Sequence, residues 1–227
     1  MGVNKLITLL FPPKCMLCRC VCEDELCARC AAGGQWTRTS LDSTACVAAV
    51  SYEGAWRDAL LAFKFRGRRG LARPLGALIT QTVQTAWPEA MPDVVTWVPV
   101  SHERLRERGY DQARLLAKVV ARRLDRPLLP ALRKVKHTEA QSGLSTAQAR
   151  RENVAGTYQL LPRLSFSGQR VLVIDDIVTT GATLSQALDA LRPSGGVYAC
   201  AVVARTDSTP LPGSRAEKGS EDTTYSK

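Results

Sequence analysis

The chain has 227 residues, of which 45% are hydrophobic and 23% are charged, a composition typical of one globular core with a small appendage. Lysine and arginine number 31 against 21 acidic residues, so the formal net charge is +10. The composition argues against a disordered protein, and the charge favours polyanionic partners such as nucleic acid or phosphorylated metabolites.

A short apolar run near the start of the chain, Leu6 to Phe11, is ended by Pro12 and Pro13. It is much shorter than the roughly 20 residues that span a bilayer, and it lacks the length and cleavage pattern of a secretory signal. We therefore predict a cytoplasmic protein without membrane insertion. The run itself is predicted to form a short helix that packs onto the protein.

Two Cys-x-x-Cys knuckles follow, formed by Cys15 with Cys18 and by Cys27 with Cys30. Four thiolates that converge on one ion suit a structural zinc site, and in a cytoplasmic chain metal binding is favoured over disulfides. A redox pair and an iron–sulfur cluster are the alternatives. The predicted role of the metal is to fold a module of residues 1–35 that is too small to build its own core.

Four further cysteines complete the count of eight. Cys20 and Cys22 lie between the knuckles and compete with the four predicted ligands. Cys46 and Cys200 lie in apolar runs and are interpreted as buried packing residues.

The central part of the chain alternates between strand and helix patterns. Strands are predicted at 46–52, 94–98, 156–161, 171–174 and 197–205, and helices at 55–65, 71–86, 111–124 and 184–191. This alternation predicts one α/β domain over 45–205, with a mostly parallel sheet and helices on both faces. Residues 206–227 lack periodicity and are predicted to be a disordered tail. Two interpretations of the polar segment 137–153 are equally compatible with its composition: a simple connector, or a mobile loop that closes over a substrate.

The most informative stretch is 171–183. Four aliphatic residues end in Asp175 and Asp176, and a small, hydroxyl-rich loop then opens a helix; the loop residues are Thr179, Thr180, Gly181, Ala182 and Thr183. Ligands bind at the carboxyl ends of parallel strands, and neighbouring carboxylates can accept both vicinal hydroxyls of a ribose. Loop amides and the helix dipole can hold a phosphate. A pyrophosphate would bring Mg²⁺, which prefers oxygen ligands.

Two alternatives exist for this stretch. The acids could merely cap a turn at the end of a strand. The acidic strand of a P-loop ATPase is excluded, because the chain contains no Gly-x-x-x-x-Gly-Lys-[Ser/Thr].

A strand-end loop at 98–101 precedes a run of arginines. Val100, Ser101 and Arg104 are candidates for contact with pyrophosphate through backbone amides and guanidinium groups. The alternative is a surface turn with Arg/Glu pairs three or four residues apart. A candidate surface for single-stranded DNA consists of Lys64, Arg66, Arg104, Arg106 and Arg108. Bases of the DNA could stack on Tyr110 or Trp56. The alternative is that these basic residues are merely solvated faces of helices.

These features together resemble the ComF family of competence and DNA-utilisation proteins, and residues 171–183 resemble the signature of type I phosphoribosyltransferases. The other matching elements are the cysteine knuckles, Phe63-Lys64-Phe65, the segments 98–112 and 141–153. The resemblance implies a type I phosphoribosyltransferase-like fold with a zinc module, a role in the uptake or use of DNA, and single-stranded DNA as a partner.

The enzyme hypothesis is transfer of a phosphoribosyl group from phosphoribosyl pyrophosphate, with Mg²⁺, to an acceptor that the sequence does not specify. In it Asp175 and Asp176 are the catalytic pair on the ribose, and 179–183 hold the 5-phosphate. The alternative is a non-catalytic protein that binds single-stranded DNA on the same fold.

Overall fold

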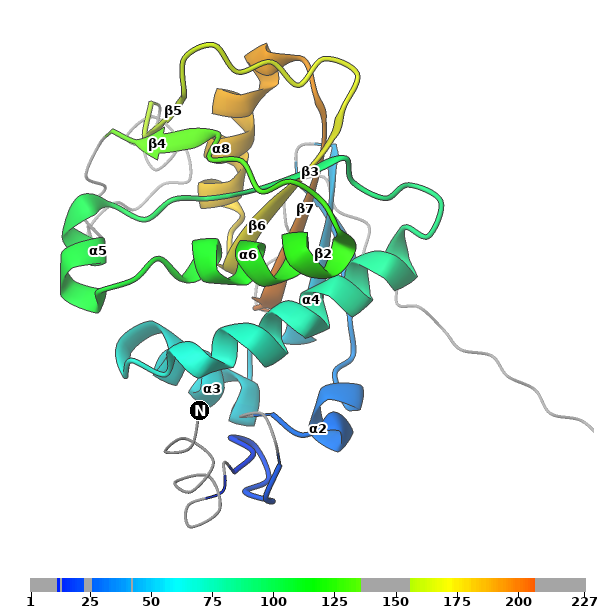
Figure 1. Ribbon diagram of the computed structural model, residues 1–227, viewed down its shortest axis with the longest axis vertical. Coiled ribbons are helices and arrows are strands. Elements are labelled where there is room, and N and C mark those ends of the chain that lie inside the picture. Colours follow the sequence, from blue (N-terminus) through cyan, green and yellow to red (C-terminus); the bar gives the residue numbers. More distant parts are fainter. Residues whose placement is uncertain (1–11, 13, 23–25, 42, 136–155, 207–227) are drawn as a thin grey trace, which may run out of the picture.

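The computed structural model describes residues 12, 14–22, 26–41, 43–135 and 156–206 (Figure 1). The segments predicted as a short helix at 6–11, a loop at 137–153 and a tail beyond Thr206 lie outside these residues. No helix in the described part of the chain is long and apolar enough to cross a bilayer.

The central sheet has five strands in the order β1-β2-β7-β6-β3. Strands β2, β7, β6 and β3 are parallel neighbours, whereas β1 pairs antiparallel with β2 at one edge. The prediction of a mostly parallel sheet is therefore confirmed. The strands are β1 Thr37–Leu41, β2 Thr44–Ser51, β3 Val94–Trp97, β6 Arg170–Val178 and β7 Val197–Arg205.

Strand β6 is buried on both faces, which explains its unbroken aliphatic run. Val171 and Val173 belong to one apolar cluster, and Leu172 and Ile174 belong to the cluster on the opposite face. Successive side chains of a strand point to opposite faces, so a strand between two helical layers needs apolar residues at every position. The polar residues of β6 therefore lie toward its carboxyl end, where the parallel strands of the sheet end.

Helices cover both faces of the sheet. Figure 1 shows α4 (Ala72–Ala86) and α6 (Gln112–Leu124) side by side over one face, while α8 (Ala182–Leu191) covers the other. The two neighbours approach closely at Gly76, where an added Cβ would lie 2.6 Å from the Cβ of Val119. The layered α/β architecture thus matches the alternation of the sequence.

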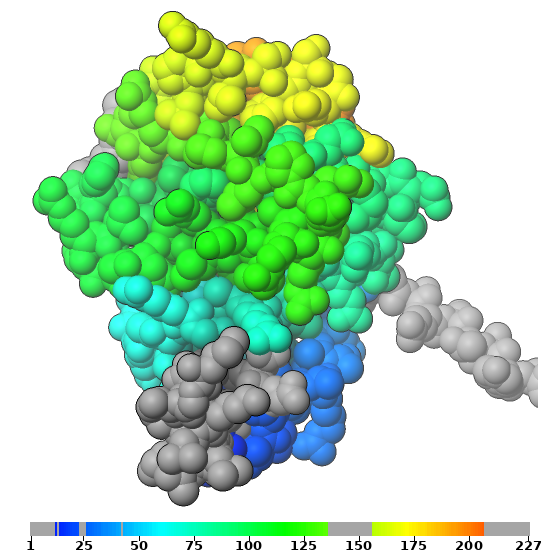
Figure 2. Space-filling view, in the orientation of Figure 1, coloured from blue at the N-terminus to red at the C-terminus, as the bar shows by residue number. Residues whose placement is uncertain are grey.

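Three further elements border the carboxyl ends of the strands. These are α3 (Gly54–Phe65), α5 (His102–Arg108) and a small antiparallel sheet of β4 (Leu132–Lys134) with β5 (Tyr158–Leu160). Figure 1 shows β4 and β5 at one end of the molecule and the cysteine-containing segment with α2 (Ala28–Ala32) at the other. In Figure 2 the green surface that includes α6 adjoins a cyan band, and the blue surface of the cysteine-containing segment lies on the far side of that band.

The structure differs from the sequence-based prediction at several places. Asp175 and Asp176 lie within β6 and not after it, because β7 continues to pair with β6 as far as Val178 opposite Arg205. The elements β1, β4, α2 and α5 were not predicted. Each of these elements is short. Strand β1 is stabilised by pairing with the adjacent β2, and β4 by pairing with β5, which is more distant in the sequence; local sequence does not reveal such pairing.

Cys46 and Cys200 lie opposite one another on the adjacent strands β2 and β7. Both are fully buried within the cluster that includes α8. Their predicted role as packing residues is confirmed.

Candidate ribose-phosphate site and cysteine cluster

A cavity of about 420 Å³ opens at the carboxyl ends of β3 and β6. Its wall combines two carboxylates, four cations and two tyrosines with the loops that follow the two strands. The lining residues that carry the argument are Tyr52, Lys64, Val100, Arg104, Arg108, Gln112, Lys134, Tyr158, Asp175, Asp176, Thr179 and Thr183. A cavity with convergent polar groups at this edge of an α/β sheet is the expected place for a ligand.

The two carboxylates occupy different electrostatic environments. Asp176 forms an ion pair with Lys64, in which its Oδ1 lies 3.1 Å from the Nζ of the lysine. The Asp175 carboxylate accepts a hydrogen bond from the amide of Asp176 at 2.8 Å. Burial, followed by repulsion from Asp176, raises the pKa of Asp175 to about 8.

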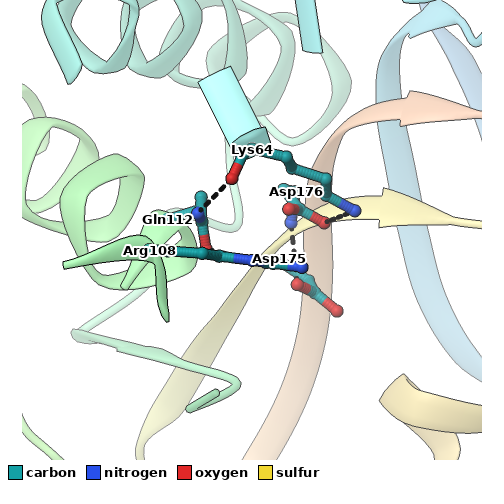
Figure 3. A network of polar contacts seen from close by, with 5 residues as sticks. All are labelled: Lys64, Arg108, Gln112, Asp175 and Asp176. Atoms are coloured by element: carbon teal, nitrogen blue, oxygen red, sulfur yellow. Dashed lines mark hydrogen bonds and ion pairs between the residues drawn. The ribbon is translucent and has the colours of Figure 1, made fainter. Parts of the chain in front are cut away.

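Gln112 joins the elements that surround these acids (Figure 3). Its Nε2 donates to the carbonyl oxygen of Lys64 at 3.3 Å, and its Oε1 accepts from Nη1 of Arg108 at 3.2 Å. The side chain is only 1% exposed, so both bonds satisfy a buried amide. Figure 3 shows that the side chain of Arg108 extends toward the acidic pair.

Asp111 fixes the loop that follows β3. It caps α6 by accepting from the amide of Arg114 at 3.0 Å. Its other oxygen accepts from Nε1 of Trp97 at 3.2 Å and from the amide of Val100 at 3.4 Å. Burial raises the pKa of this carboxyl, and the three donors oppose that shift. The bonds hold Val100 at the rim of the cavity.

The predicted phosphate loop forms the turn between β6 and α8. Gly181 adopts the left-handed conformation with φ of 78° and precedes the helix. Thr179 and Thr183 line the cavity, and the hydroxyl of Thr180 accepts from the amide of Ala182 at 3.5 Å. The turn thus presents small side chains and the start of a helix to the cavity, as a phosphate cradle requires.

The predicted pyrophosphate residues divide into two groups. Val100 and Arg104 line the cavity. Ser101 is buried, and its hydroxyl caps α5 by accepting from the amide of Arg104 at 3.3 Å. The prediction did not expect this capping role, because α5 itself was not predicted.

The sequence-based site also lacked several cavity residues. Gln112, Lys134, Tyr158 and Tyr52 were not selected, and Arg108 was assigned to DNA alone. The Nζ of Lys134 lies 5.6 Å from the centre of the Tyr158 ring, and burial raises the pKa of that phenol. These residues come from four different elements and from the turn after β2, so only the tertiary fold brings them together. The clustering of basic residues was the one signal that the sequence offered.

The predicted DNA residues are also divided. Lys64 faces the cavity in its ion pair, whereas Arg66 and Arg106 are exposed. Stacking of bases on Tyr110 is wrong, because this ring is buried and its hydroxyl donates to the carbonyl oxygen of Phe63. Phe65 is instead the exposed aromatic residue of this region, with 62% of its surface accessible.

The cysteine-containing segment gathers a group of thiols that can hold a metal ion. The sulfur atoms of Cys15, Cys18, Cys20 and Cys27 all lie within 4.8 Å of one another. Cys18 lies 3.7 Å from Cys27, close to the edge of about 3.8 Å that a tetrahedral zinc site with bonds of about 2.3 Å requires. The donor set and its spacing therefore fit structural zinc.

Cys20 belongs to this group, whereas the sequence-based prediction selected Cys30 in its place. Cys30 is nevertheless near: its amide donates to the sulfur of Cys27 at 3.4 Å, and its thiol interacts with that of Cys18. Which four thiols bind the metal remains a prediction. Within the described residues, these thiols form a group of three or more potential metal ligands that lie close together.

Comparison with known proteins agrees with this architecture. The profile of the phosphoribosyl transferase domain matches residues 111–223. Among solved structures, an adenine phosphoribosyltransferase is 16% identical, with a TM-score of 0.42 over 63% of this chain and 74% of that chain. The parallel sheet, the acidic strand end and the loop into α8 define a phosphoribosyltransferase-like fold.

Curated relatives narrow the class further. Competence protein F of Haemophilus influenzae is 37% identical over 59% of this chain and 60% of its own length. Competence protein ComFC of Bacillus subtilis is 30% identical over 64% and 57%, and DNA utilization protein YhgH of Escherichia coli K12 is 29% identical over 58% and 59%. The chain is similar to these competence and DNA-utilisation proteins of the ComF family, and its matched part spans about three fifths of their length.

Proposed function

We propose that the cavity binds phosphoribosyl pyrophosphate or a related ribose phosphate. The observation that carries the proposal is the position of Asp175 and Asp176, which are partly buried near the carboxyl end of β6, two residues before the 179–183 turn. Carboxylates accept the ribose hydroxyls, while the turn offers amides to the 5-phosphate. Arg104 and Lys134 face the same cavity and complement a pyrophosphate.

With phosphoribosyl pyrophosphate as substrate, the reaction is transfer of the phosphoribosyl group. The bond from C1 of the ribose to the pyrophosphate oxygen breaks, and a lone pair of the acceptor forms the new bond to C1. Positive charge develops on the ring, so nearby carboxylates stabilise it, while cations stabilise the leaving pyrophosphate. Mg²⁺ would supply further charge neutralisation of the pyrophosphate. The chain then holds both ends of the ligand in a fixed geometry.

The decisive experiment is calorimetric titration of the full chain with phosphoribosyl pyrophosphate and Mg²⁺, and with ribose 5-phosphate. The Asp175→Asn/Asp176→Asn variant should lose binding by about 100-fold or more, since both carboxyl groups that accept the ribose hydroxyls are replaced. A matched control, Asp58→Asn/Asp189→Asn, removes two exposed carboxylates from α3 and α8 and should bind normally. Equal binding by the wild type and the site variant would refute the assignment.

If binding is found, release of pyrophosphate in the presence of candidate acceptors tests turnover. The proposal further includes zinc in the cysteine cluster and participation in the uptake or use of DNA. The role in DNA uptake or use is supported by the names of the relatives, which are two competence proteins and a DNA utilization protein.

The second candidate is a non-catalytic protein for single-stranded DNA, favoured by the surface around Phe65. The guanidinium of Arg108 lies 4.8 Å from the centre of this exposed ring, and Arg66 and Arg106 are exposed nearby in the sequence. A base stacked on Phe65 would contribute about 1–3 kcal/mol. Affinity for an oligonucleotide should fall steeply with salt and fall again in Phe65→Ala; a flat salt response would reject this candidate.

A further inference from the structure

Lys64 is a cavity residue that lies outside the phosphoribosyltransferase signature. It lies in the last turn of α3, and its ammonium reaches Asp176 at 3.1 Å on β6. Both side chains are largely buried, with 21% and 11% of their surfaces exposed. An ion pair so shielded from water is stronger than a surface pair, and loss of one partner leaves an uncompensated charge.

The backbone around Lys64 is held in place on two sides. Gln112 donates to its carbonyl oxygen at 3.3 Å. The preceding residue, Phe63, is fully buried and accepts a hydrogen bond from Tyr110. Figure 3 shows the lysine side chain directed at Asp176 from this anchored turn. Its position is therefore set by the fold and not by a flexible surface.

Several other charged or titratable groups face the acids. Asp175 on β6 and Asp111 before α6 repel Asp176, whereas Arg108 of α5 attracts it. Asp175 in turn interacts with Lys134 of β4 and Tyr158 of β5. Among the described residues, Lys64 is the cation that forms a direct ion pair with Asp176. The remaining groups are common to any variant at position 64.

Adjacent carboxylates compete for protons, and the proton goes to the one with less support from cations. A ribose hydroxyl that donates a hydrogen bond is bound more strongly by an ionised carboxylate than by a neutral carboxyl group. We propose that Lys64 is a positioning residue of the ribose-phosphate site, whose ammonium keeps Asp176 ionised and directed into the cavity so that it accepts a ribose hydroxyl. This inference rests on the proposed function and assigns a role in it to α3.

The test is the pH profile of ribose 5-phosphate binding to Lys64→Met, measured by calorimetry from about pH 5 to about pH 9. Loss of the cation favours the protonated form of Asp176, so the profile should move upward by about one pH unit or more. On the acid limb of the profile, affinity should then be reduced by up to about tenfold, and it should recover toward alkaline pH. The phosphate of the ligand titrates equally for every variant and cancels in the comparison.

Two controls separate charge from packing. Lys64→Arg retains the cation and should restore the wild-type profile. Arg57→Met removes an exposed cation two turns earlier on the same helix and should leave the profile unchanged. Lys64→Gln, a polar neutral variant, provides the same measurement if the methionine variant does not fold.

The possible outcomes are distinct. A profile that is lowered by one factor at every pH would show that Lys64 acts only through packing, which overturns the inference. An unchanged profile would overturn it as well. Failure of the wild-type chain to bind ribose 5-phosphate or phosphoribosyl pyrophosphate would instead refute the proposed function on which the inference rests.

Discussion

The sheet and the cysteine-containing segment are stabilised in different ways. The sheet buries an apolar layer on each face, whereas only Cys15 and Leu26 are buried among the described residues of 12–33. Those two residues pack against the α4 side of the core. A segment with so little apolar burial depends on cross-links or metal for its order. The two regions should therefore respond to different perturbations, the cysteine-containing segment to loss of metal and the sheet to changes in its buried groups.

Removal of metal should produce the largest difference between the regions. Structural zinc contributes about 10–16 kcal/mol in small zinc peptides, so chelation should abolish the hydrogen-exchange protection of residues 14–33. The sheet should keep its protection, because its core lies outside the thiol cluster. Hydrogen exchange with mass spectrometry, before and after chelation and after zinc is added back, measures both regions in one experiment. Unchanged protection in a sample shown to be metal-free would contradict this expectation.

Acidity should affect the sheet domain through Asp175. Its pKa of about 8 in the folded protein is far above the value of about 3.9 in an unfolded chain, so the folded state binds this proton more tightly. The stabilisation that results is complete below about pH 4 and is lost as the pH rises toward about 8. Asp175→Asn resembles the protonated form and should lack this loss.

The Tm of Asp175→Asn should therefore exceed that of the wild type by several degrees near about pH 8, with the difference shrinking toward acid, since about 1 kcal/mol moves Tm by about 2–4 °C at this size. Thermal unfolding followed by circular dichroism at a series of pH values provides the measurement. Parallel curves for the two proteins would show that Asp175 does not hold an extra proton in the fold.

The smallest effect is expected at Ser101. Loss of its cap in Ser101→Ala should cost about 1 kcal/mol in urea unfolding, and Ser101→Asn, which retains a capping group, should cost less. Ligand affinity should change little, because the hydroxyl is buried against the amide of Arg104. A large loss of affinity at unchanged stability would return Ser101 to the ligand-binding residues.

The sequence predicted most of what is local in this fold. The aliphatic run of β6 and the Thr-Thr-Gly turn identified the strand, the helix and the candidate site, because these residues are adjacent in the chain. It did not predict the Lys64–Asp176 pair or the Gln112 bridge, since their partners lie on α3, α5 and β6. The buried ring of Tyr110 was misjudged for the same reason. The limits of the module and the domain, 1–35 and 45–205, stay predictions.

The pair of cysteines in the sheet has a practical consequence for such measurements. Cys46 and Cys200 face each other on β2 and β7 without solvent contact, whereas Cys18 and Cys20 are exposed. Buried thiols are inert toward alkylating reagents until the surrounding structure opens. The chain therefore contains two natural sets of probes. The labelling rates of the clustered thiols report local opening of the cysteine-containing segment, and those of the sheet thiols report global unfolding.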